Sequence, residues 1–201
     1  DSVLCRIAER LVEKDSLNFK YLISHTLPKS TSNLANLQHI DANQLYSVDR
    51  LYAYDKDLSY PIVDLIKDNY YSECIQTFLI CFDRTDPIGM SVKEKINYFW
   101  VLLSFYEKYF NRRPDISSII FCNVPHMPWD ILLFYFCKSI GVKTIFLRKT
   151  GIAGYIYIDE DFRPGKSEMY FRYAKSSTFA EIENINLIKL SHIKELNFTK
   201  N

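Results

Sequence analysis

The sequence predicts an α/β domain over residues 1–201, with a Rossmann-like parallel sheet and helices on both faces of that sheet. Two observations lead to this prediction. A buried strand, a helix and a second buried strand follow one another within residues 117–148. Long amphipathic segments precede this unit, as expected of helices that cover a sheet. With 201 residues, 48% of them hydrophobic, the chain is long enough to bury a core.

The strand–helix–strand unit is the clearest pattern in the chain. Residues 117–123 (SSIIFCN) and 142–148 (VKTIFLR) are short apolar runs, which are typical of strands buried on both faces. Between them, residues 128–141 (PWDILLFYFCKSIG) begin with Pro and end with Gly, the expected asymmetry of a helix. A connection of this kind joins parallel strands through a right-handed crossover.

Two longer helices are predicted before this unit. The first has Pro61 near its first turn and ends at about Asp83. The second starts at Ser91, because Ser91 and Glu94 have the spacing of a capping box. It stops at residues 111–115 (NRRPD), where proline interrupts the helical pattern.

The remaining segments have weaker patterns. Residues 3–14 have the spacing of an amphipathic helix, and residues 19–24 that of a strand. Residues 28–44 are polar, and we expect a loop with some helical turn there. In the tail, residues 160–201, a helix is predicted over 185–196 (INLIKLSHIKEL).

Composition argues against several classes of protein and site. The formal net charge of +1 provides no broad basic surface, so we predict no nucleic-acid partner. No run of about 18 apolar residues occurs, so we predict no transmembrane segment. Without a glycine-rich phosphate loop or metal-ligand spacing, we predict no cofactor and no metal. An odd number of cysteines without a CxxC pair indicates reduced thiols and a cytoplasmic location; they are Cys5, Cys74, Cys81, Cys122 and Cys137.

Polar residues follow both strands of the 117–148 unit. They are Asn123, His126 and Asp130 after the first strand, and Arg148, Lys149 and Thr150 at the end of the second. Parallel strands end at the same edge of a sheet, where ligands bind in open α/β folds, so we expect these residues to converge. We interpret His126 and Asp130 as candidate catalytic residues, and the other four as candidate substrate-binding residues.

Each of these residues also has a purely structural interpretation. Asp130 falls in the first turn of a predicted helix, where a carboxylate caps unpaired amide groups. His126 is compatible with a loop histidine bonded to backbone, and Arg148 and Lys149 with a solvated strand end. The acidic residues 159–161 are interpreted as a solvated turn rather than a metal site.

The run from residue 119 to 162 (IIFCNVPHMPWDILLFYFCKSIGVKTIFLRKTGIAGYIYIDEDF) resembles the N-terminal half of bacterial surface-carbohydrate and capsular-polysaccharide biosynthesis proteins, glycosyltransferases of the GT-B type. The resemblance lies in the Pro125-His126 turn after a strand, a Lys-x-x-Gly-Val-Lys corner at 138–143, and Glu-Asp-Phe at 160–162 after a Thr-Gly-Ile loop. It covers about residues 110–165.

This resemblance implies a sugar-transfer role for a two-domain protein. The nucleotide-sugar donor would bind mainly to a second, C-terminal domain, and the saccharide acceptor would bind to this half. His126 or Asp130 would be the general base for the acceptor hydroxyl, and Arg148 and Lys149 would meet an anionic acceptor or the donor phosphates. The chain departs from many such proteins because residues 24–34 contain no glycine-rich loop.

A second interpretation belongs to a different class, a non-catalytic α/β module that mediates assembly or binding. The aromatic content of 15% would then partly reflect an exposed apolar patch for a partner. Oligomeric state, together with the activity of His126→Ala and Arg148→Ala variants, separates the two interpretations. A nucleotide-binding hydrolase is a third interpretation, and the lack of a phosphate loop argues against it.

Overall fold

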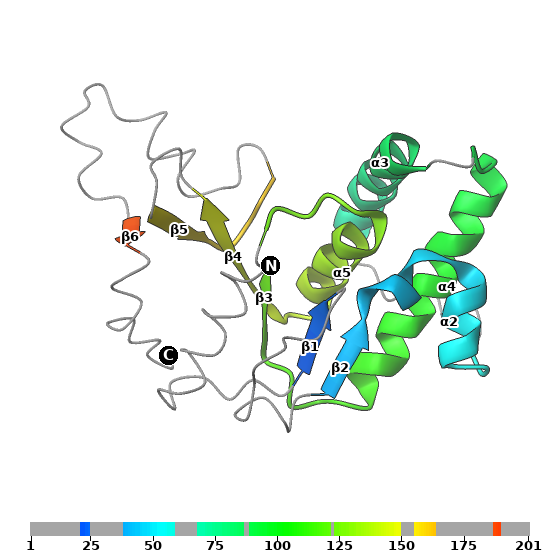
Figure 1. Ribbon diagram of the computed structural model, residues 1–201, viewed down its shortest axis with the longest axis horizontal. Helices are drawn as coiled ribbons and strands as arrows, with labels where there is room; N and C mark the ends of the chain where they lie inside the picture. The colour runs from blue at the N-terminus through cyan, green and yellow to red at the C-terminus, as the bar shows by residue number, and fades with distance from the viewer. Residues whose placement is uncertain are drawn as a thin grey trace.

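The computed structural model is a mixed α/β fold with two sheets and a group of packed helices (Figure 1). It describes residues 21–24, 38–58, 68–86, 89–121, 123–149, 155–163 and 187–189. The strands are β1 (Tyr21–Ser24), β2 (Gln38–Asp41), β3 (Ser118–Phe121), β4 (Lys143–Lys149), β5 (Tyr155–Asp159) and β6 (Leu187–Lys189). The helices are the 3-10 helix η1 (Ala42–Tyr46), α2 (Val48–Tyr54), α3 (Asp68–Thr85), α4 (Val92–Asn111) and α5 (Pro128–Ser139).

The predicted strand–helix–strand unit is confirmed. β3 pairs with β4 in parallel, in a register that places Ser118 opposite Lys143 and Phe121 opposite Phe146. α5 connects the two strands and begins with Pro128 at its first position. Gly141 follows its C-terminus with φ of 78°, a left-handed conformation that glycine adopts without steric cost.

The larger sheet is mixed, which corrects the expectation of a wholly parallel one. Its order is β3-β4-β5-β6, and β5 pairs antiparallel with both β4 and β6. The connection between β4 and β5 covers only residues 150–154, whereas a parallel crossover needs about a dozen residues or more. The short connection therefore turns the chain back on itself.

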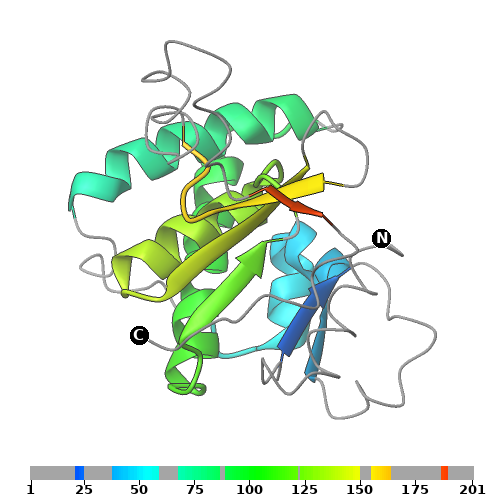
Figure 2. The same cartoon turned by 90° about the vertical axis from the view of Figure 1, so that its left-hand side faces the viewer.

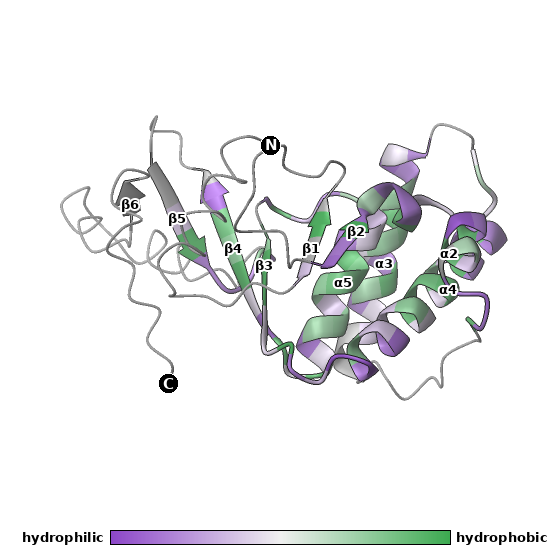
Figure 3. Ribbon diagram, turned by 60° about the horizontal axis from the view of Figure 1, so that its bottom comes forward, coloured by the Kyte–Doolittle hydropathy of each residue, from purple (hydrophilic) through white to green (hydrophobic). Residues whose placement is uncertain are grey.

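The smaller sheet contains β1 and β2, which are parallel to each other. Figures 1 and 3 show β1 beside β3, on the side away from β4, with β2 beyond it. Figure 2 looks onto the strands with the helices behind them, so the described helices cover one face of the strands. Helices on both faces, as the sequence predicts, are therefore not seen within the described part of the chain.

The two long helices agree with prediction where the structure describes them. α3 ends at Thr85, close to the predicted end, while the predicted start near Pro61 lies outside the described residues. The capping box of α4 is confirmed: the Glu94 N–H donates to Ser91 Oγ at 3.3 Å, and the Ser91 N–H donates to Glu94 Oε2 at 2.7 Å. α4 ends at Asn111, where the stop signal begins.

Two short strands were wrongly predicted as other structures. β2 lies in the segment expected to be loop and helical turn, and η1 follows it directly. β6 lies within the segment 185–196, for which a helix was predicted. Each strand pairs with a distant partner, and this pairing overrides a weak local pattern. The predicted helix over 3–14 lies outside the described residues.

Aromatic side chains form much of the core between α3, α4, α5 and the larger sheet. Phe78 of α3 meets Phe99 of α4 edge to face, with ring centroids 5.1 Å apart. Phe146 of β4 stacks on Phe121 at 4.9 Å and also contacts Phe134 of α5. Contacts of this kind add to the stabilisation from burial and tie α5 to the sheet.

Three of the predicted reduced thiols are described, and all three are free and buried: Cys74, Cys81 and Cys137. Cys5 and Cys122 lie outside the described residues. None of the described helices is both long enough and apolar enough to cross a lipid bilayer.

Candidate functional site

The segment 123–127, called here the His126 loop, leads from the end of β3 to the start of α5. It lies at the carboxyl edge of the parallel pair β3 and β4, where the sequence predicts a site. Its conformation is held by Asp130 in the first turn of α5. Asp130 Oδ1 accepts the Met127 N–H at 2.8 Å, and Oδ2 accepts the His126 N–H at 3.1 Å. Asp130 is therefore a helix cap, as its structural interpretation proposed.

The carboxyl group of Asp130 is unusually buried for its type, with 6% of the residue exposed. Burial raises its pKa to about 6, and the hydrogen bonds from His126 and Met127 oppose that rise. The group thus changes its protonation state near neutral pH, beside the histidine at the edge of the sheet.

The imidazole of His126 is exposed, with 63% of the side chain accessible. Its Nδ1 lies 3.0 Å from the Val124 carbonyl oxygen and 3.7 Å from Asp130 Oδ2. A carbonyl oxygen only accepts, so this contact assigns the proton of the neutral ring to Nδ1 and the lone pair to Nε2. No described residue forms a hydrogen bond with Nε2. An exposed ring with its proton on Nδ1 and a lone pair on Nε2 has the form of a general base.

A residue that the sequence did not reveal completes the support of the loop. The Cys81 thiol, near the end of α3, donates to the His126 carbonyl oxygen at 2.8 Å. Burial raises the pKa of Cys81 to about 11, so the sulfur stays protonated and remains a donor. The two residues are 45 positions apart, and no local pattern in either segment predicts the contact.

Arg148 lies two residues beyond Phe146 on β4, and its described partners are on β5. Arg148 Nη1 is 3.3 Å from Asp159 Oδ2, and the guanidinium lies over the Tyr157 ring at 5.2 Å. Asp159 is buried, with 4% of the residue exposed. The structure therefore joins His126 to Asp130 but connects Arg148 to neither by any described contact.

The other three predicted site residues are less completely described. Asn123 is exposed, and its Oδ1 accepts the Val124 N–H at 3.0 Å, which stabilises the start of the loop. Lys149 is the last residue of β4, so its backbone lies at the predicted edge. Thr150 lies outside the described residues.

The acidic residues after β5 do not form the solvated turn that the sequence predicts, except at Glu160. Glu160 is exposed and pairs with Lys143 at 2.9 Å. Asp161 instead holds Arg163, with Oδ2 2.6 Å from Nη2 and Oδ1 2.9 Å from Nε. Burial opposes ionisation of Asp161, but the bonds from Arg163 outweigh it and lower the pKa of this carboxyl.

Arg163 also reaches the helices. Its Nη1 lies 3.1 Å from Glu73 Oε2, and the Tyr135 hydroxyl donates to Glu73 Oε1 at 2.9 Å. We call Glu73, Tyr135, Asp161 and Arg163 the Arg163 cluster. It lies beside the amino end of β4, at the edge opposite the His126 loop, because Glu160 contacts Lys143 and Thr144 there.

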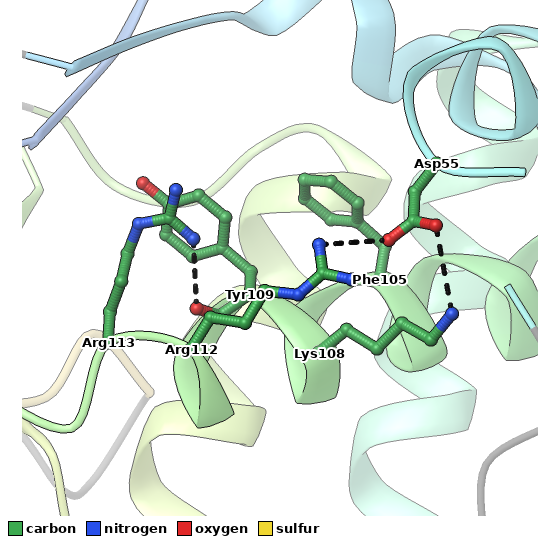
Figure 4. A pocket seen from close by; sticks show the side chains of 6 residues that line it. All are labelled: Asp55, Phe105, Lys108, Tyr109, Arg112 and Arg113. Atoms are coloured by element: carbon green, nitrogen blue, oxygen red, sulfur yellow. Dashed lines mark hydrogen bonds and ion pairs between the residues drawn. The ribbon is translucent and has the colours of Figure 1, made fainter. Parts of the chain in front are cut away.

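A shallow cavity of about 30 Å³ lies at the C-terminal end of α4 (Figure 4). Its lining contains three cationic side chains, one carboxylate and two aromatic rings: Asp55, Phe105, Lys108, Tyr109, Arg112 and Arg113. Arg112 Nη1 is 3.3 Å from Asp55 Oδ2, and Arg113 packs over the Tyr109 ring at 3.9 Å. The volume suits about two water molecules and is too small for a sugar.

Comparisons with known proteins give no further guidance, because the chain matches no protein-family model, no curated protein and no solved structure. Within the described ranges, no group of three or more histidine, cysteine or acidic side chains is arranged to hold a metal ion. The geometry of the His126 loop therefore carries the functional argument.

Proposed function

We propose that this chain is the acceptor-side domain of a glycosyltransferase-like protein that acts in bacterial surface-polysaccharide biosynthesis. The observation that carries the proposal is the exposed imidazole of His126, with its proton directed to Val124 and its lone pair on Nε2. The resemblance of residues 119–162 to such proteins supplies the substrate class.

The arrangement of strands supports a ligand site at this loop. Read across Figure 3, the strands follow the order β2, β1, β3, β4, although no backbone pairing joins β1 to β3 among the described residues. β2 follows β1 on one side and β4 follows β3 on the other, so the direction in which the chain adds strands reverses between β1 and β3. In Rossmann-like folds, ligands bind at such a reversal, beyond the carboxyl ends of the strands. The His126 loop begins at the carboxyl end of β3.

The proposed chemistry uses His126 as the general base. Nε2 takes the proton of an acceptor hydroxyl as its oxygen forms a bond to the anomeric carbon of the donor sugar. The bond from that carbon to the nucleotide breaks, and the nucleotide leaves with the electron pair. Asp130 Oδ2 lies 3.7 Å from Nδ1, so its carboxylate stands beside the positive charge that the ring gains when it takes the proton.

The remaining contacts to substrate are assigned by position. Asn123 lies in the His126 loop, and Arg148, Lys149 and Thr150 occupy or follow the end of β4. We assign these four residues to the saccharide acceptor. The carboxylate of Asp159 neutralises the charge of Arg148. Arg148 would therefore act through directed N–H groups rather than as a free cation. The nucleotide-sugar donor would bind mainly to a second domain.

The test is an NMR titration of the labelled chain with oligosaccharide acceptors, combined with a transfer assay on the proposed two-domain protein, called here the parent protein. A saccharide is expected to shift the His126 ring signals and the amide signals of Asn123 and Val124, but not those of Glu73. In the parent protein, His126→Ala should lower the transfer rate by about 10²- to 10⁴-fold. His39→Ala, in β2, is the matched control and should retain activity.

Unchanged transfer by a folded His126→Ala protein would refute the role of this histidine. Saccharide-induced shifts confined to another part of the chain would refute the site.

One observation favours the alternative, a non-catalytic assembly module. Ile80 of α3 and Val92 of α4 are strongly exposed, at 62% and 67%. An association with a second copy of the chain would bury exposed aliphatic side chains of this kind. Light scattering tests this: a dimer that Ile80→Glu and Val92→Glu dissociate, together with full activity of His126→Ala, would support assembly over catalysis.

A further inference from the structure

The backbone on both sides of His126 is held by side chains from two helices. The His126 N–H, in the peptide unit before its Cα, donates to Asp130 of α5. In the peptide unit after its Cα, the Met127 N–H donates to Asp130 and the His126 carbonyl accepts from Cys81 of α3. Two fixed peptide planes determine the direction of the Cα–Cβ bond, and the contact of Nδ1 with the Val124 carbonyl oxygen at 3.0 Å then orients the ring about that bond.

We propose that Cys81 is a positioning residue for the imidazole of His126, acting through the hydrogen bond from its thiol to the His126 carbonyl. The proposal rests on the proposed function of His126 as a general base and extends that site to α3. With the carbonyl held, the ring stays where Nδ1–H reaches Val124, and Nε2 keeps its lone pair. Without it, the bonds to Asp130 are the only described side-chain bonds left to the backbone of His126 and Met127.

Simple packing of a buried thiol is the competing explanation, and a second cysteine on the same helix separates the two. Cys74 is also in α3 and is 0% exposed, compared with 6% for Cys81. Burial raises the pKa of both thiols, so neither is a ready nucleophile. Only Cys81 of this pair contacts the His126 loop among the described residues.

The test follows the His126 ring by ¹H–¹⁵N NMR in wild type and in Cys81→Ala, Cys81→Val, Cys81→Ser and Cys74→Ala. The first two variants remove the donor, and valine also fills the space. Both are expected to lose the signature of a single Nδ1–H tautomer and to shift the titration midpoint of the ring. Cys74→Ala should keep both properties of wild type even where it lowers stability.

Cys81→Ser is expected to rescue the wild-type ring spectrum. The sulfur lies only 2.8 Å from the carbonyl oxygen, so a serine hydroxyl, on its shorter bond to Cβ, would still lie within hydrogen-bond reach of the same oxygen. In the parent protein, Cys81→Val should lower kcat by about 10- to 100-fold with little change in KM, because the base is misplaced rather than removed.

A wild-type tautomer and titration curve in folded Cys81→Val would overturn the proposal, as would failure of serine to restore them. The ring spectra require no substrate, so they test the positioning role of Cys81 independently of sugar transfer. If Cys81→Val disturbs the ring while His126→Ala leaves transfer intact, the positioning contact stands and only the proposed function fails.

Discussion

The two edges of the β3–α5–β4 unit use polar side chains in different ways. At the carboxyl edge, Asp130 and Cys81 bond to the backbone of the His126 loop, and the imidazole they support remains exposed. At the amino end of β4, the members of the Arg163 cluster bond mainly to one another. Asp161 takes two nitrogens of Arg163, and Glu73 takes a third.

This difference separates a candidate site from a structural tie. Where side chains satisfy the backbone, a neighbouring functional group can be presented to solvent in a fixed direction. Where charged side chains pair with each other, their charges are neutralised within the folded protein. The Arg163 cluster in this way joins β5 to α3 and α5. We therefore propose a function for the His126 loop and a stabilising role for the Arg163 cluster.

The largest expected effect on stability is that of Asp161→Ala in the Arg163 cluster. The side chains of Asp161 and Arg163 are only 13% and 11% exposed, so the substitution leaves a largely buried guanidinium short of its main partner. Breaking a buried pair in this way costs about 3 kcal/mol or more in unfolding free energy. Urea denaturation measures the loss.

The matched control for that measurement is the neighbouring Glu160→Ala. Glu160 is 63% exposed and pairs with Lys143, which is 58% exposed, so its loss should cost less than about 1 kcal/mol. Equal losses for Asp161→Ala and Glu160→Ala would contradict the assignment of the cluster as a buried tie.

The second effect is a pH dependence of stability that arises from Asp130 at the carboxyl edge. The pKa of Asp130 in the folded protein, about 6, lies above its ordinary value of 3.8, so the folded protein holds this proton more tightly than the unfolded chain does. The stability that this gives is fully present below about pH 4 and is lost as pH rises to about 6, by about 3 kcal/mol at 1.36 kcal/mol per pKa unit.

Asp130→Asn cannot titrate, so wild type should lose this amount relative to the variant between pH 4 and pH 7 in urea denaturation. Asp49→Asn, at an exposed carboxyl in the first turn of α2, is the control for the chemical change from aspartate to asparagine. A difference between wild type and Asp130→Asn that stays constant with pH would argue against a raised pKa.

The smallest effect is expected for Glu73→Gln. Glu73 is 46% exposed, and glutamine keeps an oxygen that can accept the Tyr135 hydroxyl, so only a partly screened attraction to Arg163 is lost. We expect a loss below about 1 kcal/mol in thermal or urea unfolding. A loss as large as that of Asp161→Ala would show that the charge of Glu73 is as important to the cluster as that of Asp161.

The candidate site was predictable only in its local part. His126 and Asp130 are four residues apart across a loop–helix junction, so the cap that joins them follows from the start of α5. Arg148 was expected to join them, but β5 runs antiparallel to β4 and presents Asp159 to it instead. That partner depends on strand order, which short apolar runs do not specify.

Local sequence signals are enough to predict the capping box at Ser91, α5 between Pro128 and Gly141, and the parallel pair β3 and β4. The folded structure was needed to find that β2 and β6 are strands, that Cys81 supports His126, and that Asp161, Arg163 and Glu73 meet. The two groups differ in the distance along the chain over which their interactions act. Caps and periodicity act between near neighbours, whereas these contacts exist only after folding brings distant segments together.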